Sequence, residues 1–338
     1  MIPFDRWRAA ALNSVMKAIA CTGYGSPEVL QLIEIPKPVP AADEIVIRVR
    51  ATTVTSGDWR IRSLEMPPGF GLMAHLIFGL TKPRQPILGS EVAGEVESVG
   101  NMVTTFRPGD RVLAFDGAKM GCHAEFKSMK AAGCVVALHD DIDFETAAAL
   151  PFGGTTALHF LRKTDVREGE KVLVIGASGS VGSAIVQLAS HRGAMVTGVC
   201  GSSNVDLVRS LGAGQVVDYS KQDVLSLGAQ FDVVFETVGS LNISQTLTLL
   251  RDGGRAAMIA GGLADTVLAM FRGKSRGIKV VAGPAGELVE DLQEILDLTV
   301  SKAYRPVIDS THAFEDIPKA HLRVQGKRKR GNVVVTTG

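Results

Sequence analysis

The chain has 338 residues, of which 46% are hydrophobic, 21% are charged and 37 are glycine, and its net charge is +1. This composition is typical of a folded α/β protein with many tight turns, and it excludes a largely disordered chain. The balanced charge also excludes a global field that would attract nucleic acid or an anionic membrane. The length predicts roughly two domains.

The first fifteen residues, MIPFDRWRAAALNSV, lack the continuous apolar segment of a signal peptide. We expect residues 1–15 to form an N-terminal extension outside the core fold. The four cysteines of the chain include no C-x-x-C pair, which favours a reducing cytoplasm. The apolar segment 70–80, FGLMAHLIFGL, is shorter than the roughly 20 residues of a membrane span. It therefore predicts a hydrophobic lid or a surface for a partner, and no membrane span.

Residues 16–138 contain short segments rich in Val and Ile that are interrupted by Pro and Gly. This pattern predicts a compact antiparallel β domain or partial barrel. From about residue 146, longer helical and strand-like segments alternate, which predicts a doubly wound parallel sheet of the Rossmann type.

Two later segments bear on domain organisation and assembly. A strand in residues 253–262, GGRAAMIAGG, is expected at the far edge of the parallel sheet, where a second subunit would pair with it in a homodimer. The closing segment 331–338, GNVVVTTG, is expected to return to the N-terminal β domain, because its backbone groups must pair there. The expected domains are therefore a catalytic domain of residues 16–148 and 284–338 and a cofactor domain of residues 149–283.

The sequence VLVIGASGSVGSAIVQLA, residues 172–189, carries the strongest chemical signal. A buried strand runs into three glycines spaced three apart, and an amphipathic helix follows at once. Small residues at such a turn let the backbone approach a pyrophosphate, and the helix N-terminus favours negative charge. A tight turn that binds nothing is the alternative. The residues expected to bind the dinucleotide here are Gly176, Ala177, Ser178, Gly179, Ser180, Val181 and Gly182.

The end of the next strand, AMVTGVC, bears on the choice between the two dinucleotides. It leads into residues 201–204, GSSN, which carry no acidic side chain. NAD sites commonly place Asp or Glu there, so Ser202 and Ser203 favour NADP(H) over NAD(H). The loop also lacks a cation for the 2′-phosphate. Tyr219 and the basic run of residues 327–330 are candidates for that role, although the run is equally well explained as a solvated surface cluster.

With these segments the chain closely resembles the medium-chain dehydrogenase/reductase superfamily, in its zinc-independent quinone oxidoreductase branch. The resemblance covers residues 16–338 and rests on VTSGDWRIRS, PILGSEVAGEVESVG, AAALPFGGTTALHFL, FDVVFETVG and RGNVVVTTG, in the family's order. It implies a GroES-like partial β-barrel catalytic domain and a Rossmann NADP-binding domain, with the active site between them. The cofactor assignment also includes Val238, Ile259, Gly261, Arg330 and Asn332.

Zinc-bearing relatives have a ligand Cys in the segment that matches residues 54–63 and a Gly-His-Glu triplet where this chain has Gly89, Ser90 and Glu91. A catalytic zinc needs about three nitrogen, sulfur or carboxylate ligands, and hydroxyls are poor substitutes. Cys122 and His123 are adjacent and would point to opposite faces of a strand, so we expect a structural cysteine and a surface histidine. No metal is expected.

Without zinc, the expected reaction is hydride transfer to an acceptor that delocalises charge, which is a small hydrophobic quinone or conjugated carbonyl (enone). The resemblance implies catalytic positions at Thr55, Arg60 and Thr156, although the family often has Asn and Tyr at the first two. Ordinary capping or turn chemistry is the alternative for each, and Asp58 is expected to fix the loop. The competing functions are an NAD(P)-dependent alcohol or aldehyde oxidoreductase and a non-catalytic NADPH-binding sensor or scaffold.

Overall fold

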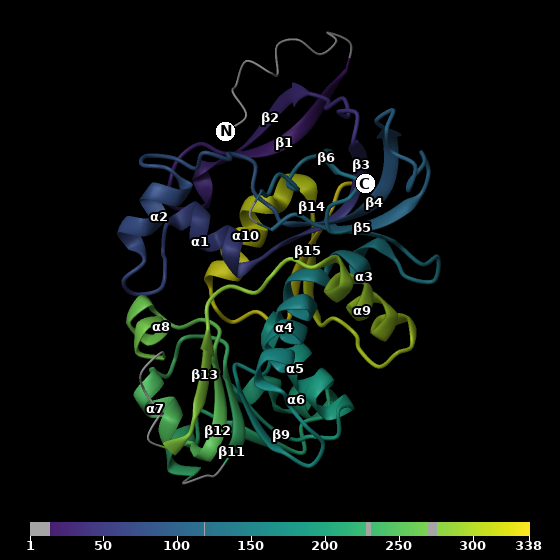
Figure 1. Ribbon diagram of the computed structural model, residues 1–338. Helices are drawn as coiled ribbons and strands as arrows, with labels where there is room; N and C mark the ends of the chain where they lie inside the picture. Colours follow the sequence, from purple (N-terminus) through teal and green to yellow (C-terminus); the bar gives the residue numbers. More distant parts are fainter. Residues whose placement is uncertain (1–13, 118, 228–230, 270–275) are drawn as a thin grey trace.

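Two bodies make up the computed structural model, which describes residues 14–117, 119–227, 231–269 and 276–338 (Figure 1). The upper body holds the β-rich segments from both ends of the sequence, and the lower body holds the parallel sheet and its helices. Most of the expected extension, residues 1–13, lies outside the described residues.

The upper body is built on a sheet with the strand order β14-β15-β3-β4-β5-β7, and β6 (Phe126–Lys130) also pairs with β3. Its long central strand β3 pairs antiparallel with β4 along a buried, Val- and Ile-rich face. A separate hairpin of β1 (Val15–Cys21) and β2 (Leu30–Pro36) packs beside this sheet. The remaining members are β3 (Glu44–Val54), β4 (Glu91–Val99), β5 (Arg111–Phe115), β7 (Val135–Ala137), β14 (Ile308–Ala313) and β15 (Asn332–Thr336).

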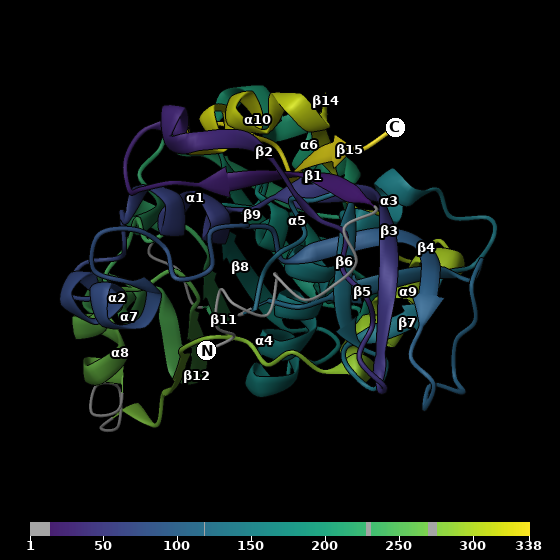
Figure 2. The same ribbon diagram turned by 90° about the horizontal axis from the view of Figure 1, so that it is seen from above.

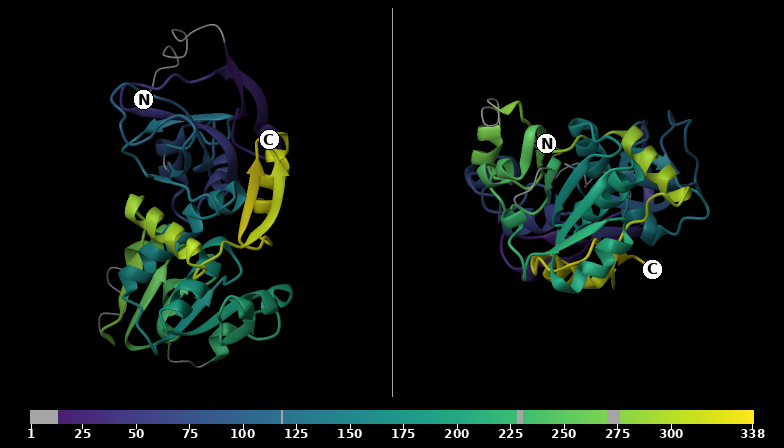
Figure 3. Two further views of the ribbon diagram at one scale, coloured as in Figure 1. Left: turned by 90° about the vertical axis from the view of Figure 1, so that its right-hand side faces the viewer. Right: turned by 90° about the horizontal axis from the view of Figure 1, so that it is seen from below.

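The final strand confirms the expected return of the chain to the N-terminal domain. β15 pairs antiparallel with β3, with Val333 opposite Val54, and parallel with β14 on its other side. Figure 3 shows these yellow strands beside the purple and blue segments of the upper body.

The lower body contains a six-stranded sheet in the order β10-β9-β8-β11-β12-β13, in which all neighbours run parallel. Alternate residues of β8 pack into two different hydrophobic clusters, one on each face of the sheet. Val172 and Val174 belong to the first cluster, and Leu173 and Ile175 belong to the second. Both faces of the sheet are therefore covered, as the alternating pattern predicts. The strands are β8 (Lys171–Ile175), β9 (Met195–Cys200), β10 (Gln215–Asp218), β11 (Phe231–Glu236), β12 (Leu250–Met258) and β13 (Lys279–Ala282).

One sequence expectation about this sheet is wrong. The strand of residues 253–262 belongs to β12, which lies between β11 and β13 and is not an edge. The edge on this side is β13, a short strand with half-buried residues that carries little sequence signal. Pairing with β13 uses the backbone groups that a second subunit was expected to satisfy.

Helices of the lower body include α4 (Thr156–Thr164), α5 (Ser180–His191), α6 (Val205–Ser210), α7 (Ile243–Thr248) and α8 (Leu263–Ala269). α4 follows a π-helical turn, Pro151–Thr155, in which two glycines allow close approach. A Cβ at Gly153 would lie 2.5 Å from Ser180 Oγ, and one at Gly154 would lie 2.4 Å from Ile295 Cγ1. The turn therefore joins α5 closely to α9 (Val289–Val300).

The helices of the upper body are α1 (Ser56–Ser63), α2 (Gly71–Phe78), α3 (Phe144–Ala148) and α10 (Ile317–Gln325). α2 lies at the side of the molecule next to α8 of the lower body (Figure 1 and Figure 2). The backbone N–H of Leu263 donates to Pro68 O over 2.9 Å, so the two bodies touch at this point. No helix in the described parts of the chain is long and apolar enough to cross a membrane.

Candidate active site

The glycine turn between β8 and α5 has the geometry of a pyrophosphate-binding turn. Gly176 has φ +81°, and a Cβ there would lie 2.5 Å from Val238 Cγ1. A Cβ at Gly182 would lie 2.1 Å from Gly176 O, so only glycine fits. Gly179 is the N-cap of α5 and makes no side-chain cap bond, which leaves the first amide groups of the helix available to an anion. The turn therefore fits a dinucleotide diphosphate.

Residues near the C-terminus lie directly on this turn. Gly331 N donates to Ser178 O over 2.8 Å, and Ser180 Oγ donates to Asn332 Oδ1 over 2.5 Å. Asn332 is buried and also donates to Val307 O, so its side chain positions the turn. The Arg330 side chain is exposed, and its backbone N–H donates to Asp309 Oδ1 over 2.8 Å.

Lys329 is a cation at the turn that the sequence analysis did not single out from the basic run. Its Nζ donates to Gly331 O, and no carboxylate lies within salt-bridge distance among the described residues. Burial lowers the pKa of Lys329 to about 8. A half-buried ammonium beside the glycine turn can hold a phosphate. In the sequence, Lys329 is distinguished from the rest of the run only by standing two residues before Gly331. Lys327 instead lies 5.1 Å from the ring centroid of Trp59, on α1.

A carboxylate lies beside the 201–204 loop, although none was expected near it from the sequence. Ser202 Oγ donates to Asp218 Oδ2 over 2.5 Å, because β10 lies beside β9 and both strands end at the same edge. Hydrogen bonds from Ser202 and Ser220 lower the pKa of Asp218 to about 2, so it is ionised. The nearest cation is Lys221, with its Nζ 3.6 Å from Asp218 Oδ2. The next strand thus supplies the charges that the 201–204 loop lacks.

Tyr219 follows Asp218 and is 67% exposed. Its hydroxyl oxygen lies 3.0 Å from the position of a Cβ on Gly201, so the ring covers this glycine at the end of β9. Ser178 Oγ accepts from Asn204 Nδ2 over 3.1 Å, which ties the loop to the glycine turn. The structure therefore brings Ser202, Tyr219 and the turn together. Ser203 is exposed in the same loop.

The segment that carries zinc ligands in relatives is held by Asp58. Its Oδ2 accepts from Thr55 N and Thr55 Oγ1 over 2.7 and 2.6 Å, and its Oδ1 accepts from Gly89 N over 2.9 Å. Asp58 is buried and therefore fixes the loop, as expected. The single hydroxyl proton of Thr55 is engaged by this carboxylate, so Thr55 has no free donor for a substrate.

These residues do not fit a catalytic zinc. The two replaced ligand positions offer only the hydroxyls of Thr55 and Ser90, and Ser90 Oγ is buried without a partner in the described structure. Among the described residues, no three His, Cys, Asp or Glu side chains form a group that could hold a metal ion. Cys122 is buried, and burial raises its pKa to about 12.

The expectation of a surface histidine at position 123 is wrong. His123 is fully buried; its Nε2 lies 2.9 Å from Thr53 O, and its ring packs edge-on against His321 at 5.7 Å. Residues 122–123 lie in a loop, not in a strand, and the backbone of His123 bonds to Ile19 and Leu88 on either side. A Cβ on Gly89, which has φ +86°, would lie 2.4 Å from the His123 ring.

Glu91 is retained from the family triplet and links the two bodies. It is fully buried at the start of β4 and accepts hydrogen bonds from Thr53 Oγ1 and from Phe152 N in the π-helical turn. Burial raises the pKa of Glu91 to about 8. No role for Glu91 was predicted from the sequence.

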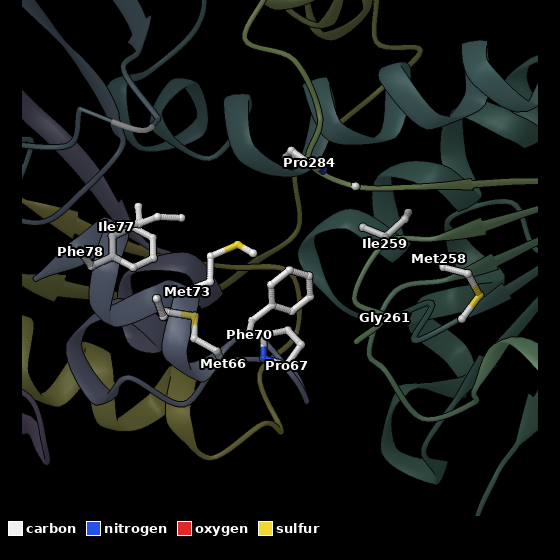
Figure 4. Close-up of a pocket in the computed structure, with 12 residues that line it drawn as sticks. Met66, Pro67, Phe70, Met73, Ile77, Phe78, Met258, Ile259, Gly261 and Pro284 are labelled. Atoms are coloured by element: carbon white, nitrogen blue, oxygen red, sulfur yellow. The ribbon is translucent and has the colours of Figure 1, made fainter. Parts of the chain in front are cut away.

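An apolar pocket of about 260 Å³ lies between the two bodies (Figure 4). The segment around α2 forms one wall, and the residues after β12 form the other, facing it. Ile259 and Gly261, expected in the cofactor site, belong to the second wall. All lining residues are apolar, glycine or proline: Met66, Pro67, Phe70, Met73, Ala74, Ile77, Phe78, Met258, Ile259, Gly261, Gly283 and Pro284.

The three expected catalytic residues, Thr55, Arg60 and Thr156, do not line this pocket. Arg60 lies on α1 and is half-buried with no hydrogen-bonding or ionic partner in the described part of the chain, and burial lowers the pKa of its guanidinium. Thr156 is the first residue of α4 and is half-buried. Residues 263–269 form α8, and residues 270–275 lie outside the described residues.

A doubly wound sheet with an uncapped glycine turn, joined to a β domain across an apolar pocket, defines a two-domain dinucleotide-dependent oxidoreductase. The family model of an alcohol dehydrogenase GroES-like domain matches residues 41–164, and that of a zinc-binding dehydrogenase matches residues 211–335.

Individual relatives agree with this class. Quinone oxidoreductase of Mus musculus is 31% identical over 340 residues, covering 96% of this chain and 98% of that protein. The chloroplastic NADPH-dependent alkenal/one oxidoreductase of Arabidopsis thaliana is 27% identical over 339 residues, covering 96% and 81%. The solved quinone oxidoreductase from Coxiella burnetii has a TM-score of 0.86 at 25% identity, covering 96% and 100%. The chain belongs to the medium-chain dehydrogenase/reductase superfamily, in its quinone oxidoreductase-like branch, and is an oxidoreductase.

Proposed function

We propose that the protein is a zinc-independent, NADPH-dependent reductase that transfers hydride to a hydrophobic quinone or enone. One combination of observations carries this proposal: a pocket lined by apolar side chains lies between the two bodies, the glycine turn fits a dinucleotide diphosphate, and the two replaced zinc-ligand positions hold hydroxyls. The relatives from mouse and Arabidopsis are named for quinone and alkenal/one reduction, respectively.

The chemistry of the acceptor follows from the missing ligands. When bound, NADPH supplies the hydride. Hydride addition to an isolated ketone localises charge on one oxygen, for which a Lewis acid is valuable. A quinone or enone spreads that charge into a phenolate or enolate, so hydrogen-bond donors and a nearby cation suffice.

Different groups of the chain are assigned to cofactor binding and to stabilisation of the acceptor. The uncapped amides at the start of α5 and the Lys329 ammonium hold the diphosphate. Arg60 is the unpaired cation on the helix next to the pocket segment, and we assign it the stabilisation of the developing oxyanion. Thr156 is assigned to the nicotinamide end. Thr55 is assigned only to positioning, since its proton is engaged by Asp58.

The preference for NADP(H) is also a proposal. Tyr219, over Gly201, offers a hydroxyl, and Lys221 offers an exposed cation near Ser202. Asp218 acts in the opposite direction, because its carboxylate repels a 2′-phosphate and accepts from a ribose hydroxyl. The balance between Lys221 and Asp218 sets the preference.

Domain limits and assembly complete the proposal. The strands of the parallel sheet lie within residues 171–282, which supports a cofactor domain of residues 149–283. The edge strand β13 offers unpaired backbone groups for a homodimer. Light scattering at micromolar concentration tests this assembly. All four cysteines are free thiols, which supports a reducing compartment such as the cytoplasm.

An acceptor panel run with both NADPH and NADH tests the function. We expect oxidation of NADPH with quinones and enones and little with simple aldehydes. Gly182→Val is the negative control, because its side chain would clash with Gly176 O and distort the turn that is expected to bind the cofactor. Turnover confined to aldehydes and alcohols, or inertness despite tight NADPH binding, would reject the proposal in favour of an alcohol oxidoreductase or a sensor, respectively.

A further inference from the structure

Large exposed apolar side chains gather on and just after α2. Five of them fall within nine residues, with exposed fractions from 45% to 78%. Elsewhere in the described residues such side chains stand alone in the sequence, apart from the adjacent pair Leu288 and Val289. A contiguous apolar patch of this kind marks an interaction surface. Its members are Leu72, Met73, Leu76, Ile77 and Leu80.

The patch has two parts with different uses. Met73 and Ile77 line the substrate pocket, and both remain about half exposed, so the pocket opens on this side. Leu72 and Leu76 are four residues apart on the same helix face, and they are not pocket-lining residues. Neither the core nor the pocket accounts for these two leucines, which are 78% and 60% exposed.

Within the segment that holds the patch, the charged side chains have one sign. Residues 66–90 contain no Asp or Glu, and the exposed Lys82 and Arg84 follow α2 directly. Arg84 is brought back against the helix, since its backbone N–H donates to Phe78 O over 2.6 Å. An apolar helix face with cations at its end complements an anionic lipid surface.

We infer that α2 docks the protein reversibly on an anionic bilayer, with Leu72, Leu76 and Leu80 in the acyl boundary and Lys82 and Arg84 at the headgroups. A second copy of the chain is a poorer occupant. Two such surfaces would bring like charges together with no acidic residue in the segment to pair with them. Docking of this kind needs no global charge, because polybasic attraction to lipid is local.

The docking has a consequence that rests on the proposed function. Because Met73 and Ile77 belong to both the pocket and the exposed surface, a bilayer on α2 faces the mouth of the pocket. A lipophilic acceptor then enters from the membrane without crossing water.

Vesicle flotation of the full-length protein tests the docking without cofactor or acceptor, so its outcome is independent of the enzymatic proposal. We expect binding to vesicles of phosphatidylcholine with phosphatidylserine, weaker binding to phosphatidylcholine alone, and loss of binding in high salt. Leu72→Asp with Leu76→Asp should lower partitioning by about tenfold or more, because each carboxylate would enter the apolar boundary.

Met102→Asp is the matched control, since Met102 is 72% exposed in a loop outside α2. It should leave vesicle binding unchanged, and all variants should keep turnover of a water-soluble enone. Absence of vesicle binding by the unmodified protein, or equal binding by the double variant, would overturn the inference. Conversion of a dimer to a monomer by the double variant would also overturn it and assign the surface to a second copy.

Discussion

The carboxylate of Asp58 holds the backbone of Gly89 in place, with Oδ1 accepting from the Gly89 N–H over 2.9 Å. Its other oxygen caps α1 through Thr55. One buried side chain thus joins the two segments in which zinc-bearing relatives carry ligands. The scaffold of those segments persists here although the ligand types are gone.

Removing this carboxylate should destabilise the fold. Asp58→Ala leaves the buried N–H groups of Thr55 and Gly89 without partners, which costs roughly 3 kcal/mol of unfolding free energy. Asp143→Ala removes an exposed N-cap on α3, where Asp143 accepts from Thr146 N, and should cost about 1 kcal/mol. Urea denaturation measures both changes. Equal losses would show that Asp58 is no more than a helix cap.

Chelation should leave activity intact. The replaced ligand positions carry Thr55 and Ser90, so the purified protein should contain no stoichiometric zinc by elemental analysis. Incubation with 1,10-phenanthroline, next to a zinc-containing alcohol dehydrogenase as control, should inactivate only the control. One tightly bound zinc per chain would contradict this prediction.

Charge at the adenosine end should control the choice of cofactor. Ser202→Asp adds a second carboxylate beside Asp218. At an effective dielectric of about 20, charges about 4 Å apart repel by on the order of 4 kcal/mol before screening. The NADPH affinity should therefore fall tenfold or more, while the NADH affinity holds. Michaelis constants for the two cofactors measure the effect.

Two conservative variants separate the charges already present. Asp218→Asn should raise NADPH affinity and Lys221→Ala should lower it, each by about two- to fivefold, because solvent screens a charge pair whose Lys221 side chain is 76% exposed. A higher affinity for NADH than for NADPH in the unmodified protein would instead assign Asp218 to the ribose hydroxyls.

Stability should fall as the pH rises from about 4.5 to 8 because of Glu91. Burial raises the pKa of Glu91 from 4.5 to about 8, so the native state binds more protons than the unfolded chain in this window. The contribution of this group is full below pH 4.5 and is lost as the pH rises through 8, with a slope of at most about 1.4 kcal/mol per pH unit. Denaturation of Glu91→Gln across this range should lack the slope. An unchanged slope would attribute the pH dependence to other groups.

The pocket wall should govern the length of the acceptor. Phe70→Ala removes apolar surface from the wall, so kcat/KM for enones with long alkyl chains should fall roughly tenfold while that for the smallest enone changes little. Leu80→Ala is the control, since Leu80 is 70% exposed and does not line the pocket. An equal loss for acceptors of every length would place Phe70 outside the binding site.

Local features of the fold were predictable from the sequence. The strand, glycine turn and helix of residues 172–189 are local signals, since spacing and small residues suffice to specify them. The return of the final strand was predictable from the need to pair its backbone. The edge of the parallel sheet was not predictable, because the edge strand β13 is only four residues long and its sequence carries little strand pattern.

Features that depend on which strands lie side by side could not be predicted from the sequence. Asp218 meets Ser202 only because β10 lies beside β9 in register, with Asp218 opposite Cys200. His123 is buried only because its loop is pinned between β1 and the residues before β4. The engagement of the Thr55 proton depends on a side-chain rotamer that no sequence pattern specifies.

The pairing of β15 with β3 also imposes an order of events on synthesis. The strands β8 to β13 are contiguous, so the parallel sheet has all its parts before the last segments leave the ribosome. The sheet of the upper body is completed later, because its central strand β3 is synthesised early and the neighbouring strand β15 is synthesised after all the other strands. Until then the end of β3, residues 51–54, has one unpaired backbone edge. The nascent protein is thus exposed to aggregation through β3, a strand that is made early and whose pairing is completed late.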